Sequence, residues 1–351
     1  MKRSVGRFGI LALFTCMAMT AAADDFDSTT APVGRLTNGI VTPVNQIVTP
    51  AGFTLRLRGM RPQALALSPN GKLLVTSGLK HELVVLGPVS GKVLTNVALP
   101  SDQAGPQAPV SGEILDPNEQ AKLSFTGLVF SPDGSRIFMA NEGGDIKVFG
   151  VARNDTVSPL YSLPLPAANA PYRKAEIPAG VAVSRDGKRL YVALNLSNRL
   201  VEMDAATGNV LRTWDVGVAP FDVVLAGNKV YVSNWGGRRP GPNSFTGPAG
   251  RGTLVRVDNR YIADEGSVSL IDLNSKSDTQ KSELLTGIHS CALALSPNGR
   301  YLVVANAGSD TLSVIDARYD TIVETICARR TSHSGPAAHK WSRQSCRIAH
   351  R

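Results

Sequence analysis

Residues 127–140 read GLVFSPDGSRIFMA, and close copies of this phrase occur at 64–76 (ALALSPNGKLLVT), 180–193 (GVAVSRDGKRLYVA) and 292–305 (ALALSPNGRYLVVA). Each copy predicts a β-hairpin, in which an apolar run forms one strand and Ser-x-Asp/Asn-Gly forms a tight turn. A second strand, rich in β-branched and aromatic residues, then returns antiparallel to the first. A degenerate copy, VVLAGNKVYVSN, occupies 223–234. The recurrence indicates a repeat protein.

A second hairpin phrase follows several of these copies. Its clearest examples are 198–214 (NRLVEMDAATGNVLRTW) and 309–326 (SDTLSVIDARYDTIVETI), with shorter versions at 144–149 and 266–273. Two successive hairpins make a four-stranded antiparallel sheet, which is the blade of a β-propeller. Tyr191 and Tyr231, at equivalent positions, lie 40 residues apart, close to the blade period of about 40–45. Longer spacings are explained by inserts at 100–120, 150–178 and 236–263, which we predict to be surface loops.

We therefore predict an all-β fold, a β-propeller of four-stranded antiparallel blades, with about five blades visible between residues 60 and 327. A solenoid or a β-sandwich is the rival fold, but a sandwich gives no reason for a phrase repeated every 40 residues or so. Residues 24–59 are an N-terminal segment that could supply a ring-closing strand. Because a propeller closes its ring to protect sheet edges, so few blades favour a truncated ring and predict self-association through an open edge.

The first 23 residues have the architecture of a secretory signal peptide. Lys2, Arg3 and Arg7 precede an apolar run at 9–19, and three alanines end at Ala23, before Asp24. The apolar run is too short to span a bilayer. We expect cleavage near Ala23 and a periplasmic or secreted mature chain without a transmembrane span.

The formal net charge of +9 does not indicate a nucleic-acid-binding protein. Three basic residues lie in the signal peptide and six in residues 328–351, which leaves 28 basic and 28 acidic residues between them. A neutral body has no built-in attraction for phosphate, so we expect no nucleic-acid partner. Residues 328–351 contain no acidic residue and no strand pattern. They are either a disordered basic tail or an out-of-frame end, and we favour the second interpretation.

The repeats with Tyr191-Val192-Ala193, Tyr231-Val232-Ser233-Asn234 and the SPDG or SPNG turns resemble the YVTN family of bacterial propellers. Four longer stretches (61–78, 175–200, 216–242 and 305–327) look like the N-terminal propeller of exported proteins in which an alkaline-phosphatase-like phosphoesterase domain follows. YVTN-family members usually have seven blades, so the resemblance implies truncation from a seven-bladed ring. This chain ends at the propeller, and no phosphoesterase motif maps onto any of its residues.

The usual catalytic signatures are missing from the sequence. It has no Gly-x-Ser-x-Gly elbow, no phosphate-binding loop and no dinucleotide fingerprint. His81 and His289 are the only histidines before the tail, and we interpret both as loop residues rather than metal ligands. The long spacings of Cys291, Cys327 and Cys346 do not form a disulfide framework, and we expect Cys291 to be buried. We predict no catalytic residues, no metal site and no cofactor.

Residues 204–214 (DAATGNVLRTW) resemble the docking phrase of quinoprotein dehydrogenase propellers. Those propellers repeat the phrase, whereas it occurs once here. A single Asp-x-x-Thr-Gly stretch is also a good hairpin turn. A quinone-dependent dehydrogenase therefore stays a minor alternative.

The insert after the 223–234 hairpin, NWGGRRPGPNSFTGPAGRGTLVRVD, is the candidate binding surface. Its candidate anchors are Trp235, Arg238, Arg239, Arg251 and Arg256, because Trp and Arg are common anchors and Arg pairs with carboxylate or phosphate. A solvated loop is the competing interpretation. We expect a non-enzymatic, exported binding or scaffold module for a protein, peptide or cell-envelope ligand. The alternative is the truncated propeller of a propeller–phosphoesterase.

Overall fold

The computed structural model describes residues 32–36, 39–41, 47–48, 54–102, 117–249 and 253–328. Every regular element in these ranges is a β-strand. The chain divides into two units, residues 1–54 with 332–334 and residues 55–331 with 335–351. The predicted signal peptide and the residues from 329 onward lie outside the described residues.

The first unit holds a small antiparallel sheet of three strands, β1 (Gly34–Leu36), β2 (Gly39–Val41) and β3 (Ile47–Val48). Within it, β2 pairs with β1 on one side and β3 on the other. That this segment closes a propeller ring stays a prediction.

The second unit contains five four-stranded antiparallel sheets, the blades expected from the repeats. Blade 1 is β4 (Ala64–Leu67), β5 (Leu74–Ser77), β6 (Glu82–Leu86) and β7 (Val93–Ala98). Blade 2 is β8 (Leu123–Phe130), β9 (Arg136–Asn141), β10 (Asp145–Val151) and β11 (Val157–Pro164). Blade 3 is β12 (Pro178–Val183), β13 (Arg189–Leu194), β14 (Arg199–Asp204) and β15 (Val210–Asp215).

Blade 4 is interrupted by an insertion. Its strands are β16 (Pro220–Ala226), β17 (Lys229–Asn234), β20 (Gly266–Asp272) and β21 (Ser282–Thr286). The insertion carries its own two-stranded hairpin, β18 (Thr246–Ala249) with β19 (Thr253–Arg256). Blade 5 is β22 (Ser290–Leu295), β23 (Tyr301–Asn306), β24 (Thr311–Asp316) and β25 (Thr321–Cys327).

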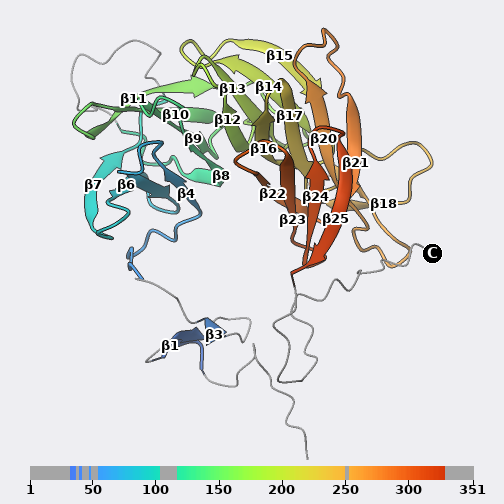
Figure 1. Cartoon of the computed structure of the whole chain (residues 1–351), viewed down its shortest axis with the longest axis horizontal. Helices are drawn as coiled ribbons and strands as arrows, with labels where there is room; N and C mark the ends of the chain where they lie inside the picture. Colours follow the sequence, from blue (N-terminus) through green and yellow to red (C-terminus); the bar gives the residue numbers. More distant parts are fainter. Residues whose placement is uncertain are drawn as a thin grey trace, which may run out of the picture. The chain divides into compact units, whose positions relative to one another are not determined.

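The first strand of each blade contacts the first strand of the next, from β4 through β8, β12 and β16 to β22. The five blades therefore form a row in sequence order, with blade 1 and blade 5 at its two ends (Figure 1). In blades 1, 2, 3 and 5 the inner strand begins at one end of the blade and finishes at the Ser-x-Asp/Asn-Gly turn at the other end, whereas β16 of blade 4 finishes at Gly227-Asn228.

The repeated turn owes its shape to a small set of hydrogen bonds. In blade 2 the Ser131 hydroxyl donates to Asp133 Oδ1 (2.5 Å) and accepts from the Arg136 amide (2.9 Å), while Asp133 Oδ1 also accepts from the Ser135 amide (3.0 Å). Gly134 follows with φ +73°, a conformation that costs glycine little. The same serine-to-Asx bond closes the turns at 68–71, 184–187 and 296–299.

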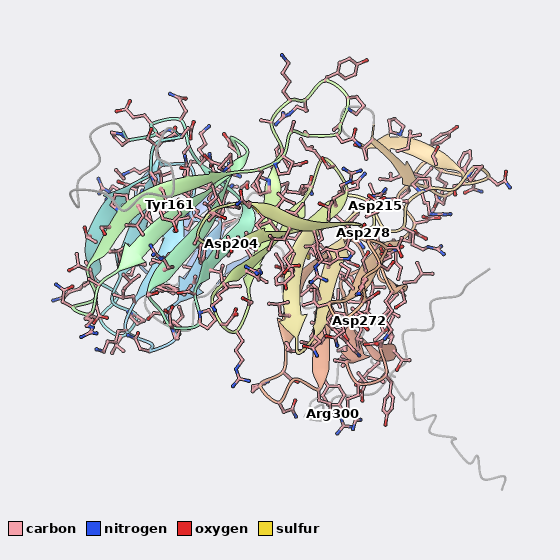
Figure 2. The ribbon with its side chains drawn as sticks, turned by 90° about the horizontal axis from the view of Figure 1, so that it is seen from above. Tyr161, Asp204, Asp215, Asp272, Asp278 and Arg300 are labelled. Atoms are coloured by element: carbon pink, nitrogen blue, oxygen red, sulfur yellow. The ribbon has the colours of Figure 1, made fainter. Side chains whose placement is uncertain are left out.

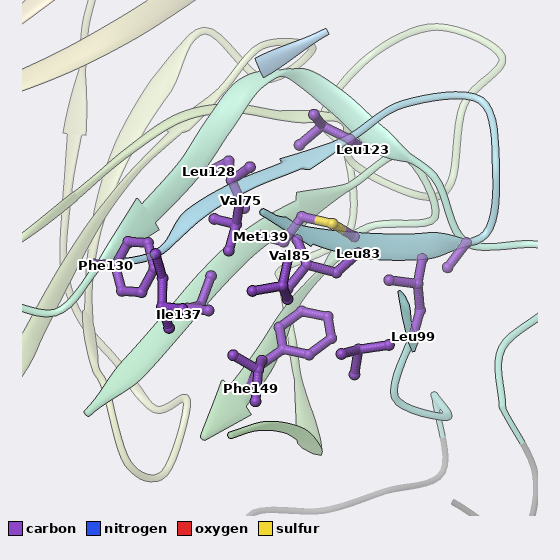
Figure 3. Packing of buried hydrophobic residues seen from close by; sticks show 14 residues of the cluster. Val75, Leu83, Val85, Leu99, Leu123, Leu128, Phe130, Ile137, Met139 and Phe149 are labelled. Atoms are coloured by element: carbon purple, nitrogen blue, oxygen red, sulfur yellow. The ribbon is translucent and has the colours of Figure 1, made fainter. Parts of the chain in front are cut away.

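The core lies between the blades. Alternate residues of a strand point to opposite faces, so Ile137 and Met139 pack toward blade 1 whereas Phe138 and Ala140 pack toward blade 3. Figure 3 shows the first of these layers, in which Val75, Leu83 and Val85 of blade 1 meet residues of blade 2. Corresponding buried clusters join blades 3 and 4 and blades 4 and 5.

The inner strands also approach one another closely at two glycines of the repeat. A Cβ on Gly127 would lie 2.2 Å from the Ala179 carbonyl oxygen, and one on Gly180 would lie 2.6 Å from the Asp222 Cα. Between blades 4 and 5, the Asp222 carboxylate accepts the Leu293 amide at 2.8 Å, and burial raises the pKa of this carboxyl. Backbone contact, not only side-chain packing, therefore ties successive blades.

The two end blades expose apolar side chains on the faces that lack a neighbouring blade. Leu65 and Leu67 of blade 1 are 64% and 56% exposed. In blade 5, Cys291 is half-buried and donates its thiol to the Ala305 carbonyl. The expectation of a buried Cys291 was therefore wrong, because no further blade packs on that side within the described residues.

We expect Gly187→Ala to destabilise the fold by about 1 kcal/mol, because Gly187 has φ +72° and an L-residue is strained there. The added methyl group would have no neighbouring atom within 4 Å. The substitution therefore measures the cost of backbone strain alone, without a steric clash. Urea unfolding measures the change, with Gly241→Ala as the control because Gly241 does not have a positive φ. Equal midpoints for the two variants would contradict this account of the turn.

Candidate binding site

The insertion of blade 4 is fixed to the body by a small apolar cluster. Val255 and Val257, on and just after β19, pack with Val218, which lies just before β16. A Cβ on Gly236 would lie about 3 Å from both Val218 and Val255. The glycine therefore allows the hairpin to seat closely, and the hairpin is held over the end of the blade where the inner strand begins.

A row of four aromatic rings crosses this end of the molecule. Phe125 of blade 2 lies 5.5 Å from Phe221 of blade 4, and Phe221 lies 5.7 Å from Trp235, between ring centroids. Trp235 stacks on His289 of blade 5, with centroids 4.7 Å apart and planes only 10° from parallel. None of the four rings is fully buried, so together they form an aromatic surface contributed by three blades.

One end of this row forms a wall of a hollow of about 250 Å³, which we call the aromatic hollow. Its main lining residues are Trp235, Pro248, Val255, Val257, Tyr261 and His289. The Tyr261 ring is 68% exposed and lies 5.1 Å from Phe245. The hollow thus combines apolar walls with aromatic faces, which is the usual lining of a small ligand pocket.

His289 is the polar side chain at the base of the stack. Its ring nitrogens make no hydrogen bond within the described ranges, and burial lowers the pKa of its imidazole below 6.5. The ring is therefore neutral near pH 7, with one nitrogen able to donate and the other able to accept.

Several ring-bearing residues of this region have unusual backbone angles. Phe125, Tyr261 and His289 have φ values of +46°, +62° and +56°. Bulky residues rarely adopt this left-handed conformation, and such strain clusters at functional sites. The geometry that presents these rings is therefore imposed by the fold against local preference.

A second hollow, of about 360 Å³, lies on the other side of β19, and we call it the arginine hollow. Its main lining residues are Asp215, Arg238, Arg239, Arg256, Gln280 and Glu283. Asp215 pairs with Thr279 as an isolated bridge, so the end of β15 and the 275–280 segment lie together, as Asp215 and Asp278 do in Figure 2.

The arginines of this hollow are already paired inside the protein. The Arg238 guanidinium donates to Glu265 Oε2 at 2.7 Å, and the Arg238 backbone amide donates to Glu265 Oε1 at 2.8 Å. The side-chain hydrogen bond to Glu265 raises the pKa of the Arg238 guanidinium. Arg239 donates to the Val216 carbonyl (2.6 Å), to the Asn198 carbonyl and to Asp215 (3.1 Å). Both side chains therefore brace the insertion.

The predicted anchors are thus divided between two hollows. Trp235 lies in the aromatic hollow, Arg238, Arg239 and Arg256 line the arginine hollow, and Arg251 lies outside the described residues. Tyr261 and the aromatic partners of Trp235 were not predicted from the sequence. The sequence did contain a pattern that could have indicated these partners. An aromatic ring or histidine occurs near the start of three inner strands, at Phe125 in β8, Phe221 in β16 and His289 just before β22. The loops of several blades converge at that end, so side chains at these positions are expected to lie close together.

Other singled-out residues serve the fold. Trp214 is fully buried between blades 3 and 4 and donates its indole N–H to the Ser277 carbonyl at 3.1 Å. Asp204 caps its own turn by accepting the Ala206 and Thr207 amides, so residues 204–209 form a hairpin turn and residues 210–214 belong to β15. His81 bonds the Ala121 carbonyl at 2.8 Å. No cluster of three metal-binding side chains occurs in the described ranges.

The described part of the chain contains no helix with the length and apolar character that a membrane span requires.

No protein-family model and no curated protein matches the chain. Among solved structures it is similar to Kuenenia stuttgartiensis hydrazine synthase, with a TM-score of 0.51 and 16% identity, covering 78% of this chain and 68% of that one. It is also similar to the β-propeller domain of Myceliophteria thermophila Cps50 (Swd1), with a TM-score of 0.50 and 12% identity, covering 87% and 88%. Identities this low establish only the fold, so the chain is a β-propeller, as predicted, and membership of the YVTN family stays a prediction.

We expect the fluorescence of Trp235 to report the protonation of His289, because an imidazolium stacked on an indole quenches its emission. Burial lowers the pKa of His289, so the difference in emission between the protein and His289→Gln should titrate with a midpoint below pH 6.5 as the pH falls. A midpoint at or above 6.5 would show that the indole face stabilises the cation more than burial penalises it.

Proposed function

We propose that this protein is an exported propeller that acts as a binding or scaffold module and has no catalytic site of its own. Its ligand is a protein, a peptide or a component of the cell envelope. The observation that carries the proposal is the half-exposed stack of Trp235 on His289 beside the aromatic hollow. Export rests on the signal-peptide pattern of residues 1–23.

The surface around this stack suits recognition. Aromatic side chains held rigidly by a scaffold give a large contact area at a low entropic cost, and Trp is enriched among binding anchors. The wall formed by the stacked Trp235 and His289 comes from two blades, since Trp235 follows β17 and His289 precedes β22, and the insertion of blade 4 supplies the other lining residues. The scaffold therefore sets the distance between the walls before a ligand arrives, which reduces the ordering cost of binding.

A peptide-display experiment tests the proposal. Random heptapeptides are selected on the immobilised full chain and on Trp235→Ala, and isolated peptidoglycan is tested for sedimentation with both proteins. We expect peptides or peptidoglycan to bind the unmodified protein and to lose at least tenfold in affinity on Trp235→Ala, because a buried aromatic anchor contributes about 2 kcal/mol or more.

The matched control is Tyr172→Ala, which removes a ring that is 88% exposed and lies outside both hollows. This control should bind like the unmodified protein. Binding that survives Trp235→Ala, or that is lost equally in Tyr172→Ala, would contradict a site at the aromatic hollow.

A further inference from the structure

The inner strands of the blades carry different side chains on their two sides. In the four residues before the repeated turn, the second and fourth face back onto the preceding blade, as Leu128 and Phe130 of blade 2 pack in the layer shared with blade 1. The first and third face forward, as Ala64 and Ala66 of blade 1 pack against the same layer. Because alternate residues point to opposite sides, every blade has a back face and a front face.

The same fit recurs at the other three contacts between successive blades. The third residue of the equivalent stretch, which faces forward, is Val129 in blade 2, Ala182 in blade 3 and Val224 in blade 4. It packs in each case with back-facing residues of the next blade that are of equal or larger size, which are Val181, Val183, Val223, Leu225, Leu293 and Leu295. The chain therefore forms the contact between a front face and a back face four times.

The back face of blade 1 has the side chains for this contact but no blade against it within the described residues. Leu65 and Leu67 are 64% and 56% exposed, whereas the equivalent Leu128 and Phe130 of blade 2 are each only 6% exposed. The segment before β4 covers this face at β6, where Met60 packs. Two large apolar side chains of the inner strand are thus left uncovered.

The front face of blade 5 is the matching surface at the other end of the row. Ala294, Val303 and Val314 lie in register across β22, β23 and β24. None of the apolar residues on this face is fully buried, and they are Ala292, Ala294, Val303, Ala305, Leu312 and Val314. The two alanines repeat Ala64 and Ala66 of blade 1, which pack with large side chains of blade 2. Since a terminal repeat that faces solvent needs a polar outer face, this apolar face indicates a surface that packs on another.

We propose that the front face of blade 5 binds the back face of blade 1 of a second copy of this chain, so that copies associate head to tail. A second copy is the occupant because it brings the complement of each exposed face, in the pairing that the chain already forms between its own blades. The contact joins sheet faces, with Leu65 and Leu67 of one copy on Ala292 and Ala294 of the other, and not the edges of the outer strands. This inference goes beyond the proposed function and does not rest on it.

Analytical ultracentrifugation of the full chain, from about 1 µM to about 100 µM, tests the association. We expect the average mass to rise with concentration, because a head-to-tail contact leaves each growing assembly with one free face of each kind. Leu65→Glu and Ala294→Glu, which each place a charge on one face, should both remain monomeric, since burying an unpaired charge is costly. An equimolar mixture of these two variants should form a heterodimer, because each variant keeps the face that the other has lost.

The matched control is Val89→Glu, because Val89 belongs to blade 1, is 94% exposed and lies in the turn between β6 and β7, outside both faces. It should associate like the unmodified protein, and circular dichroism checks that each variant is folded. Leu65→Ser, a milder change, should weaken association at least tenfold, because the burial of a leucine side chain is lost. A monomer at the highest concentration, association that survives Leu65→Glu or Ala294→Glu, a mixture that stays monomeric, or an equal loss in Val89→Glu overturns the inference.

Discussion

The packing of one blade face against the next is the interaction on which the rest of this structure depends. Each strand of a middle blade sends alternate side chains to opposite faces, so Phe138 and Met139 belong to different layers of the core although they are neighbours in sequence. A blade therefore cannot bury its apolar residues alone, and its stability comes from both neighbours. The exposed Leu65 and Leu67 show the consequence at an end of the row.

The same packing places the candidate site. Because inner strands meet along the whole row, the residues that precede them come together at one end, and rings from blades 2, 4 and 5 form a continuous aromatic row there. The insertion of blade 4, which packs on Val218 through Val255, adds a second wall to the aromatic hollow. Rigid blades thus hold the hollows open, while the residues that differ between repeats give them their chemistry.

The hairpins, the four-stranded blades and the position of the insertion could be predicted from the sequence, because each rests on local patterns such as Ser131-x-Asp133-Gly134. Trp235 was also singled out from the sequence, and it lines the aromatic hollow; its role as an anchor stays a prediction. The ion pair between Arg238 and Glu265 could not be predicted, because Glu265 lies 27 residues further along the chain and the two side chains meet only in the folded protein. Nor could a sequence pattern show that Trp235 stacks on His289, since the two residues belong to different blades.

Amide hydrogen exchange in the presence of a bound peptide tests the central claim most directly, since the two ends of the blades are far apart in space. The account predicts slower exchange at 235–239, 253–263 and 287–290, with no change at the repeated turns 131–134, 184–187 and 296–299. Protection confined to those turns, at the other end of the inner strands, would place recognition on the opposite face and contradict the account.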